Sequence, residues 1–130
     1  MALINFFTNA FYPIIWNDNL MSSVSLSLEL LKQGRFFKRS ALMQNPQIEY
    51  YLEAYMDNPG TQGEIKIFLN NDLSPKAQMQ VTNNIPSIFE GLFSIKDLED
   101  GIHTLKILSN VNSGKINIGL VEIYQRIGEG

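Results

Sequence analysis

The chain has 130 residues, of which 45% are hydrophobic and 18% charged, and its formal net charge is −3 at pH 7. This length suits one domain with one core, and the composition is globular rather than disordered or collagen-like. The acidic balance gives no overall field that would attract a polyanion, so we expect no nucleic acid partner. The absence of cysteine excludes disulfides and thiolate metal sites.

The N-terminal segment 1–20 is strongly apolar but follows neither the helical nor the strand period. It has no Lys or Arg ahead of its apolar run, and no window of the chain reaches roughly 20 unbroken apolar residues, so we predict no signal peptide, no spanning helix and a cytoplasmic location. The segment could form an edge strand, a short helix or an arm. Because so apolar a surface is costly when exposed, we favour a subunit interface for part of it. The aromatic residues of that interface would be Phe6, Phe7, Phe11, Tyr12 and Trp16.

The first clear element is segment 24–30, in which apolar and polar residues alternate without a break. The alternation predicts a half-buried strand, whose inward face would comprise Val24, Leu26, Leu28 and Leu30. We expect a turn at Gly34 and a hairpin partner at 35–42. Segments 47–56 and 64–70 follow the same period and predict two more strands, the first with Ile48, Tyr50, Leu52, Ala54 and Met56 on one face.

Further strands are predicted at 76–82, 88–95, 102–108 and 115–126. Gly91 is expected to be a bulge or a point of close approach. In the last strand the apolar residues switch from even-numbered to odd-numbered positions, so we place a bulge at Gly119. About eight short strands predict an all-β, two-sheet antiparallel β-sandwich, C2-like or jelly-roll-like, over residues 1–130 as one domain.

The only histidine, His103, is a candidate catalytic base. A base needs an orienting partner and a nucleophile within reach, and the chain has no cysteine and no Gly-x-Ser-x-Gly elbow. We therefore favour a structural histidine, hydrogen-bonded at the end of a sheet. Nucleotide-binding and metalloprotease motifs are also absent from the sequence, so we predict no catalytic residue, no cofactor and no enzyme.

One acidic cluster, Asp97, Glu99 and Asp100, lies in a predicted turn. Calcium binds six to eight converging oxygens, of which these residues could supply some. No second acidic loop of similar density is present, so we favour a solvated turn and predict no metal.

Segment 32–39 holds four of the ten basic residues of the chain. It could contact anionic membrane lipid, where each Lys or Arg contributes about 1 kcal/mol. The candidate membrane-binding residues are Lys32, Arg35, Phe36, Phe37, Lys38 and Arg39. A strand must point the two phenylalanines to opposite faces. We therefore favour the alternative in which one phenylalanine enters the core and the charges are solvated.

The aromatic residues of the predicted strands are a possible platform for stacking sugar rings. These residues are Tyr50, Tyr51, Tyr55, Tyr124 and Trp16. Only Tyr51 and Tyr55 clearly share an outward face in the predicted strands. Ordinary packing is the more common role of such side chains, and the sugar-binding interpretation stays as an alternative.

Segments 101–107 (Gly-Ile-His-Thr-Leu-Lys-Ile) and 119–126 (Gly-Leu-Val-Glu-Ile-Tyr-Gln-Arg), with the order of the strands, resemble the XepA/YomS-type proteins of Bacillus prophage lysis regions. The resemblance covers nearly the whole chain and rests on general similarity. It implies a C2-type β-sandwich that assembles as a homo-oligomeric ring, a pentamer, and is associated with host-cell lysis without a catalytic residue. C2-type domains often bind calcium through paired Asp-x-Asp loops, which this sequence lacks. A basic or aromatic surface would then have to contact the membrane.

Two functional hypotheses follow. The first is a non-catalytic accessory protein of a prophage lysis region, located in the host cytoplasm and acting as a ring at the cell membrane. The second is a phage virion or tail component, either structural or carbohydrate-binding. A hydrolase would need a pocket that joins His103 with a carboxylate and a hydroxyl, which nothing in the sequence indicates.

Overall fold

The computed structural model describes residues 10–39 and 45–127. This part of the chain is all-β, as predicted, with nine strands in two antiparallel sheets. The strands are β1 (Ala10–Asn17), β2 (Met21–Ser23), β3 (Glu29–Lys38), β4 (Gln47–Met56), β5 (Gly63–Leu69), β6 (Ala77–Val81), β7 (Ser87–Ser94), β8 (Gly101–Val111) and β9 (Ile116–Ile127).

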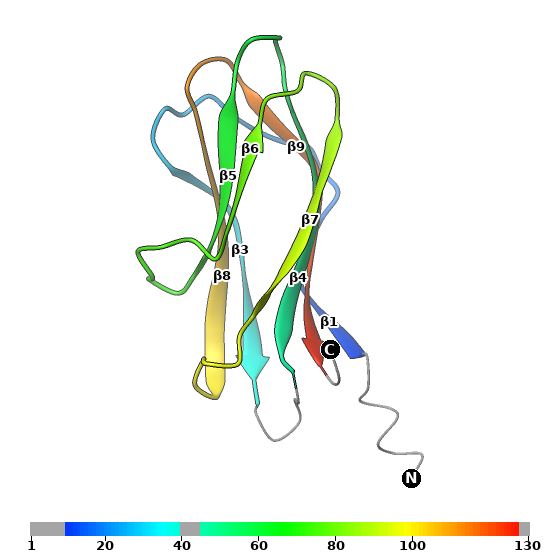
Figure 1. Cartoon of the computed structure of the whole chain (residues 1–130), viewed down its shortest axis with the longest axis vertical. Helices are drawn as coiled ribbons and strands as arrows, with labels where there is room; N and C mark the ends of the chain where they lie inside the picture. Colours follow the sequence, from blue (N-terminus) through cyan, green and yellow to red (C-terminus); the bar gives the residue numbers. More distant parts are fainter. Residues whose placement is uncertain (1–9, 40–44, 128–130) are drawn as a thin grey trace.

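Sheet A contains β1, β9, β4 and β7 in that order, and the short β2 also pairs with β9. Sheet B contains β3, β8, β5 and β6. Figure 1 shows the two sheets as two layers whose strands run along the long axis of the molecule. The predicted two-sheet β-sandwich is therefore confirmed.

The core lies between the sheets and is built by alternation along each strand. In β4 every second residue from Ile48 is buried, apart from the half-buried Tyr50, while the intervening side chains face solvent. The same pattern holds in β5 and in the second half of β8. The largest fully buried side chains are Ile48, Leu52, Met56, Ile65, Ile67, Leu69, Ile95, Leu105, Ile107, Ile116, Ile118 and Ile123.

The predicted hairpin around Gly34 is wrong. A single strand, β3, runs through Gly34 and pairs with β8 on both sides of it. A side chain at position 34 would collide with the backbone oxygen of Ile14 and would lie 2.9 Å from the Cγ1 atom of Ile15. The glycine is therefore required by the close approach of β1 to β3, and not by a turn.

The predicted half-buried strand at 24–30 is also wrong over most of its length. Residues 24–28 belong to no strand. The four side chains assigned to its inward face are instead exposed, namely Val24, Leu26, Leu28 and Leu30. A segment of alternating apolar and polar residues forms a strand only where a neighbouring strand is available to pair with that segment.

The predicted bulge at Gly119 is confirmed by the pairing of β4 with β9. Glu53 pairs with Leu120, but the next residue, Ala54, pairs with Ile118, so Gly119 is the extra residue. The bulge lets both halves of β9 place their apolar side chains in the core. Gly91 is a point of close approach rather than a bulge, because the pairing of β4 with β7 continues through it without a shift.

Strand β1, from the apolar N-terminal segment, lies at the edge of sheet A and pairs with β9. Residues 1–9 lie outside the described part of the chain. Within the described part, no helix is long and apolar enough to cross a membrane.

Candidate functional site

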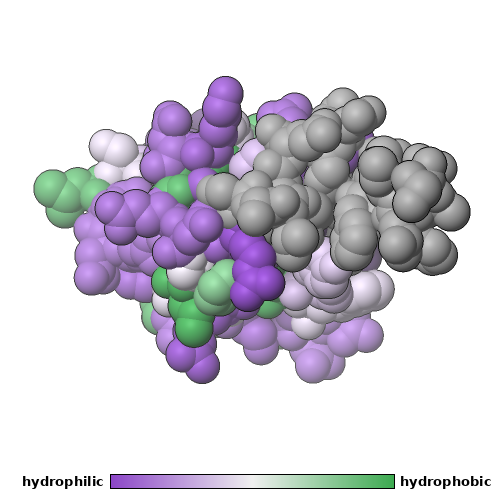
Figure 2. All heavy atoms as spheres, turned by 90° about the horizontal axis from the view of Figure 1, so that it is seen from below, coloured by the Kyte–Doolittle hydropathy of each residue, from purple (hydrophilic) through white to green (hydrophobic). Residues whose placement is uncertain are grey.

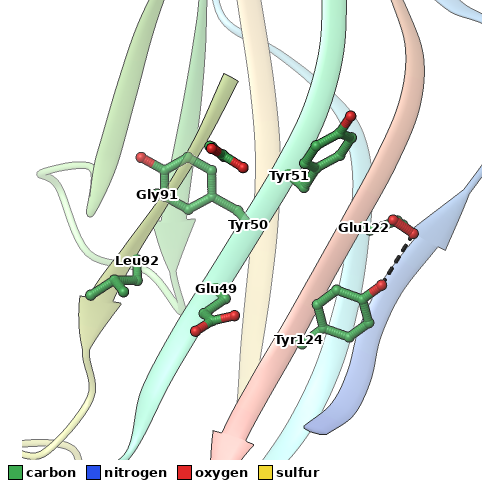
Figure 3. A pocket seen from close by; sticks show the side chains of 8 residues that line it. Glu49, Tyr50, Tyr51, Gly91, Leu92, Glu122 and Tyr124 are labelled. Atoms are coloured by element: carbon green, nitrogen blue, oxygen red, sulfur yellow. Dashed lines mark hydrogen bonds between the residues drawn. The ribbon is translucent and has the colours of Figure 1, made fainter. Parts of the chain in front are cut away.

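A groove of about 470 Å³ opens on the outer face of sheet A, across β9, β4 and β7. Figure 3 shows its lining side chains standing on these three strands. They are Glu49, Tyr50 and Tyr51 of β4, Glu90, Gly91 and Leu92 of β7, and Glu122 and Tyr124 of β9. The residue types are aromatic and carboxylate, which gives the groove flat apolar surfaces beside hydrogen-bond acceptors.

The pairing register arranges most of these side chains in two rows that cross the three strands. In one row Glu122 pairs with Tyr51, which pairs with Glu90. In the adjacent row Tyr124 pairs with Glu49, which pairs with Leu92. Residues paired directly across a sheet have side chains on the same face, with Cβ atoms about 5 Å apart. Tyr51 therefore stands between two carboxylates.

The carboxylate of Glu122 is held in place by its neighbour on β9. The phenol of Tyr124 donates a hydrogen bond of 3.1 Å to Glu122 Oε2, drawn as a dashed line in Figure 3. Burial, this hydrogen bond and the charge of Glu122 together raise the pKa of Tyr124 above its usual value of 10.0. The phenol thus stays protonated near neutral pH and fixes the carboxylate.

Glu49 is the one groove carboxylate that has a basic partner among the described residues. The Nη1 atom of Arg126 lies 2.9 Å from Glu49 Oε1, and both side chains are mostly covered. Arg126 is also the only basic residue in the strands of sheet A, which contain four carboxylates. These are Glu49, Glu53, Glu90 and Glu122. The outer face of sheet A is therefore acidic.

Tyr50 lines the groove from the inward row of β4. Its ring lies across Gly91 of the neighbouring strand, and a Cβ atom there would be 2.6 Å from Tyr50 Cζ. The ring also packs against Phe93, with ring centroids 6.5 Å apart. Gly91 thus leaves the space that this tyrosine occupies at the edge of the sheet.

Trp16 extends the aromatic surface beyond the groove onto β1. It pairs with Glu122, is 62% exposed, and meets the ring of Tyr124 edge-on with centroids 6.1 Å apart. Tyr55, the second outward tyrosine of the predicted platform, stands further along β4 and does not line the groove. The described surface thus presents Trp16, Tyr124 and Tyr51 on three adjacent strands.

The basic segment 32–39 is not a hairpin, and its side chains are divided between the two faces of β3. Phe36 is buried in the core, and Lys38 is only 2% exposed. The amine of Lys38 donates hydrogen bonds to the backbone oxygens of Lys96, at 3.0 Å, and Leu98. Phe36 and Lys38 therefore cannot contact a membrane surface, because their side chains point inward.

The other candidates of this segment are exposed on sheet B or at its edge: Lys32, Arg35, Phe37 and Arg39. Phe37 pairs with Ile102, and both are largely exposed beside a shallow groove of about 290 Å³ that Arg35 also lines. The guanidinium of Arg39 lies 5.5 Å from the centroid of the Phe37 ring. Figure 2, which views the molecule from below, shows hydrophobic residues in small separate patches among hydrophilic ones.

Of the predicted interface residues, Tyr12 and Trp16 are exposed on β1, which is compatible with a contact surface. Phe11 lies in β1, but its side chain is outside the described part of the structure. Phe6 and Phe7 lie outside the described residues altogether.

His103 has both ring nitrogens in hydrogen bonds. Asn70 Oδ1 accepts the backbone N–H of Thr104, which turns the amide nitrogen of Asn70 towards His103 Nδ1 at 3.0 Å. The Nε2 atom then carries the proton and donates to the backbone oxygen of Glu99 at 2.7 Å. The ring also packs against Phe36, so the histidine fixes the end of β8, the structural role that the sequence favours.

The acidic cluster Asp97, Glu99 and Asp100 follows β7 in the connection to β8. Across residues 10–39 and 45–127, no group of three or more His, Asp or Glu side chains is arranged to hold a metal ion. The arrangement thus gives the weak calcium hypothesis no support.

The site residues predicted from the sequence do not include Glu49, Glu90 and Glu122. Each lies at an outward position of a predicted strand, where a glutamate is ordinary. What makes them a site is the pairing of β9 and β7 with β4, which no local pattern indicates.

No family model matches the sequence, and no curated protein matches it either. Among solved structures, the chain is similar to a β-sandwich described as "CBM4 structure and function". The TM-score is 0.56 at 11% sequence identity, over 93% of this chain and 81% of that chain.

A second similarity is to the dimeric latent PorU from Porphyromonas gingivalis, with a TM-score of 0.43 and 13% identity. It covers 90% of this chain but only 13% of PorU, and so low a TM-score does not show a shared fold. The resemblance to XepA/YomS-type proteins stays a prediction, because none of these comparisons tests it. What the comparisons show is the fold, a two-sheet β-sandwich shared with the CBM4 structure.

Proposed function

We propose that the protein is a carbohydrate-binding β-sandwich module whose binding site is the groove on the outer face of sheet A. The observation that carries the proposal is the row in which Tyr51 stands between Glu122 and Glu90, with Tyr124 in the next row. A sugar ring offers apolar C–H groups on its faces and hydroxyl donors around its rim. Aromatic rings suit the first and carboxylates the second.

The shape and the fold support the same function. The groove is open and lies on rigid paired strands, so its side chains are positioned before a ligand arrives, which lowers the entropic cost of binding. The neighbouring CBM4 structure is a carbohydrate-binding β-sandwich, which is consistent with a sugar site on this fold.

The direct test is binding to a panel of soluble oligosaccharides, with Tyr51→Ala as the site variant and Tyr55→Ala as its control. Both tyrosines lie outward on β4, but only Tyr51 lines the groove. We expect the wild-type chain to bind at least one oligosaccharide, Tyr51→Ala to weaken that binding about tenfold, and Tyr55→Ala to leave it unchanged. Equal loss in both variants, or no binding to any member, contradicts the proposal.

The role predicted from the prophage resemblance, a lysis accessory protein at the membrane, is a second candidate. It is favoured by the exposed pair Phe37 and Ile102 with Arg35 and Arg39 beside them. Apolar side chains flanked by cations suit an anionic lipid surface, where each base contributes about 1 kcal/mol.

Co-sedimentation with phosphatidylglycerol and phosphatidylcholine vesicles tests this second role. We expect the wild-type chain to bind the anionic vesicles alone, and the double variant Phe37→Ser/Ile102→Ser to lose this binding. If the wild-type chain binds neither kind of vesicle, the membrane role is contradicted. The predicted pentameric ring has its own test in the molar mass in solution, and a mass near that of one 14.8 kDa chain contradicts it.

A further inference from the structure

We propose that the groove recognises a glycan that carries protonated amino groups, in preference to a neutral or acidic glycan of the same length. This inference rests on the proposed function and names the class of sugar that the site takes. It follows from the charge of the groove, from the distribution of its ion pairs, and from the position of its aromatic rings.

The charge of the groove is unbalanced. Three carboxylates line it, and the one base among the described residues that forms an ion pair with any of them, Arg126, is engaged with Glu49. Glu122 accepts a neutral phenol hydrogen bond from Tyr124, which leaves its charge in place. Within the described part of the chain, Glu90 has no ion-pair partner. Two uncompensated carboxylates thus flank Tyr51, one on each neighbouring strand.

An aromatic ring between two carboxylates is a favourable place for an ammonium group. The face of a tyrosine attracts a cation through its quadrupole, and each carboxylate accepts charge-assisted hydrogen bonds, which are about twice as strong as neutral ones. The same carboxylates repel a uronic acid or a phosphate. A neutral hydroxyl gains only an ordinary hydrogen bond, which net of solvation contributes about 1 kcal/mol.

A comparison with sheet B shows that the excess negative charge is on sheet A. The strands of sheet B contain five bases and two acids, whereas the strands of sheet A contain one base and four acids. The bases of sheet B are Lys32, Arg35, Lys38, Lys66 and Lys106, and its acids are Glu29 and Glu64. Since the acidic face is also the one that carries the aromatic groove, charge and aromatic surface coincide there.

The test compares two linear hexamers that differ only at nitrogen, the glucosamine hexamer and its fully N-acetylated form, below the pH at which the free amine loses its proton. We expect the wild-type chain to bind the amine form about tenfold more tightly. Raising the salt from 50 to 500 mM should weaken binding of the amine form and leave that of the acetylated form nearly unchanged.

Two matched variants locate the effect. Glu90→Gln should weaken binding of the amine hexamer about fivefold and change binding of the acetylated hexamer little. Glu53→Gln, in an outward glutamate of β4 that does not line the groove, should change neither.

The outcomes separate the inference from the proposed function. If both hexamers bind equally, or the acetylated one binds more tightly, the preference for amino sugars is wrong while a carbohydrate site stands. If neither hexamer binds but another oligosaccharide of the panel does, the preference for amino sugars is again wrong while the carbohydrate site stands. If no glycan binds, both fail.

Discussion

The ring of Tyr50 lies across Gly91 on the neighbouring strand, so closely that a Cβ atom at position 91 would be 2.6 Å from Tyr50 Cζ. The half-buried tyrosine would have to move to admit even a methyl group. This contact joins β4 to the edge strand β7, and both residues line the groove.

Gly91→Ala should therefore lower the free energy of unfolding by about 2 kcal/mol, the usual cost of overpacking. In the background of Tyr50→Ala, where the ring is absent, the same change should cost about 1 kcal/mol less. Urea denaturation, monitored by circular dichroism, measures the free energy of unfolding of the wild-type chain, the two single variants and the double variant. Additive effects of the two substitutions would show that the ring and the glycine do not constrain each other.

Gly34→Ala and Gly119→Ala form a second comparison. At position 34 the new methyl group meets the backbone of Ile14, which cannot swing aside, and we expect a loss of about 3 kcal/mol. At position 119 the nearest atom is Glu53 Oε1 at 3.5 Å, an ordinary contact, and we expect a loss of about 0.5 kcal/mol or less. Equal losses at the two positions would contradict the close approach of β1 to β3.

These glycines show what the sequence could and could not predict. The bulge at Gly119 was predictable because the apolar parity of β9 changes beside it, a signal within one strand. Gly34 was interpreted as a turn because its constraint comes from β1, a strand distant in sequence.

The core was predictable for the same reason as the bulge. Strands such as β4 and β5 repeat their apolar residues at every second position, and the buried residues are largely those that the alternation indicates. The alternation at 24–30 failed because no strand pairs with residues 24–28.

The groove was only partly predictable. Tyr51 could be placed on an outward face from its own strand. That Glu90 and Glu122 flank it depends on pairing between segments far apart in the chain. The direction of a side chain is local information, whereas its neighbours across a sheet are not.

Lys38→Met should lower the free energy of unfolding by about 2 kcal/mol. The buried amine binds the backbone oxygens of Lys96 and Leu98, and its removal leaves both acceptors without this donor. The control is Lys32→Met in the same strand, where the side chain is exposed and we expect little change. Thermal unfolding by circular dichroism compares them, and similar midpoints for both variants would show that the hydrogen bonds of Lys38 contribute little.

The raised pKa of Tyr124 predicts a dependence on alkaline pH. Because the folded state holds the proton more tightly than the unfolded state, the contribution to stability is present below the usual tyrosine pKa of 10.0. It is lost as the pH rises through the higher pKa of the folded state.

An ultraviolet absorbance titration should therefore show one late-ionising tyrosine that disappears in Tyr124→Phe. In Glu122→Gln, which removes the charge of the hydrogen-bond partner, the pKa should move back towards 10.0. An unchanged late ionisation in Tyr124→Phe would assign the raised pKa to another residue.

The fluorescence of Trp16 tests the carbohydrate site most directly. It is the only tryptophan of the chain, it is 62% exposed, and it meets Tyr124 at the border of the groove. Titration with the tightest-binding oligosaccharide of the panel should shift its emission to shorter wavelength and protect it from acrylamide quenching, in a saturable manner that Tyr51→Ala weakens. Emission and quenching that stay constant while that oligosaccharide binds would place the binding site elsewhere and contradict a sugar site on the outer face of sheet A.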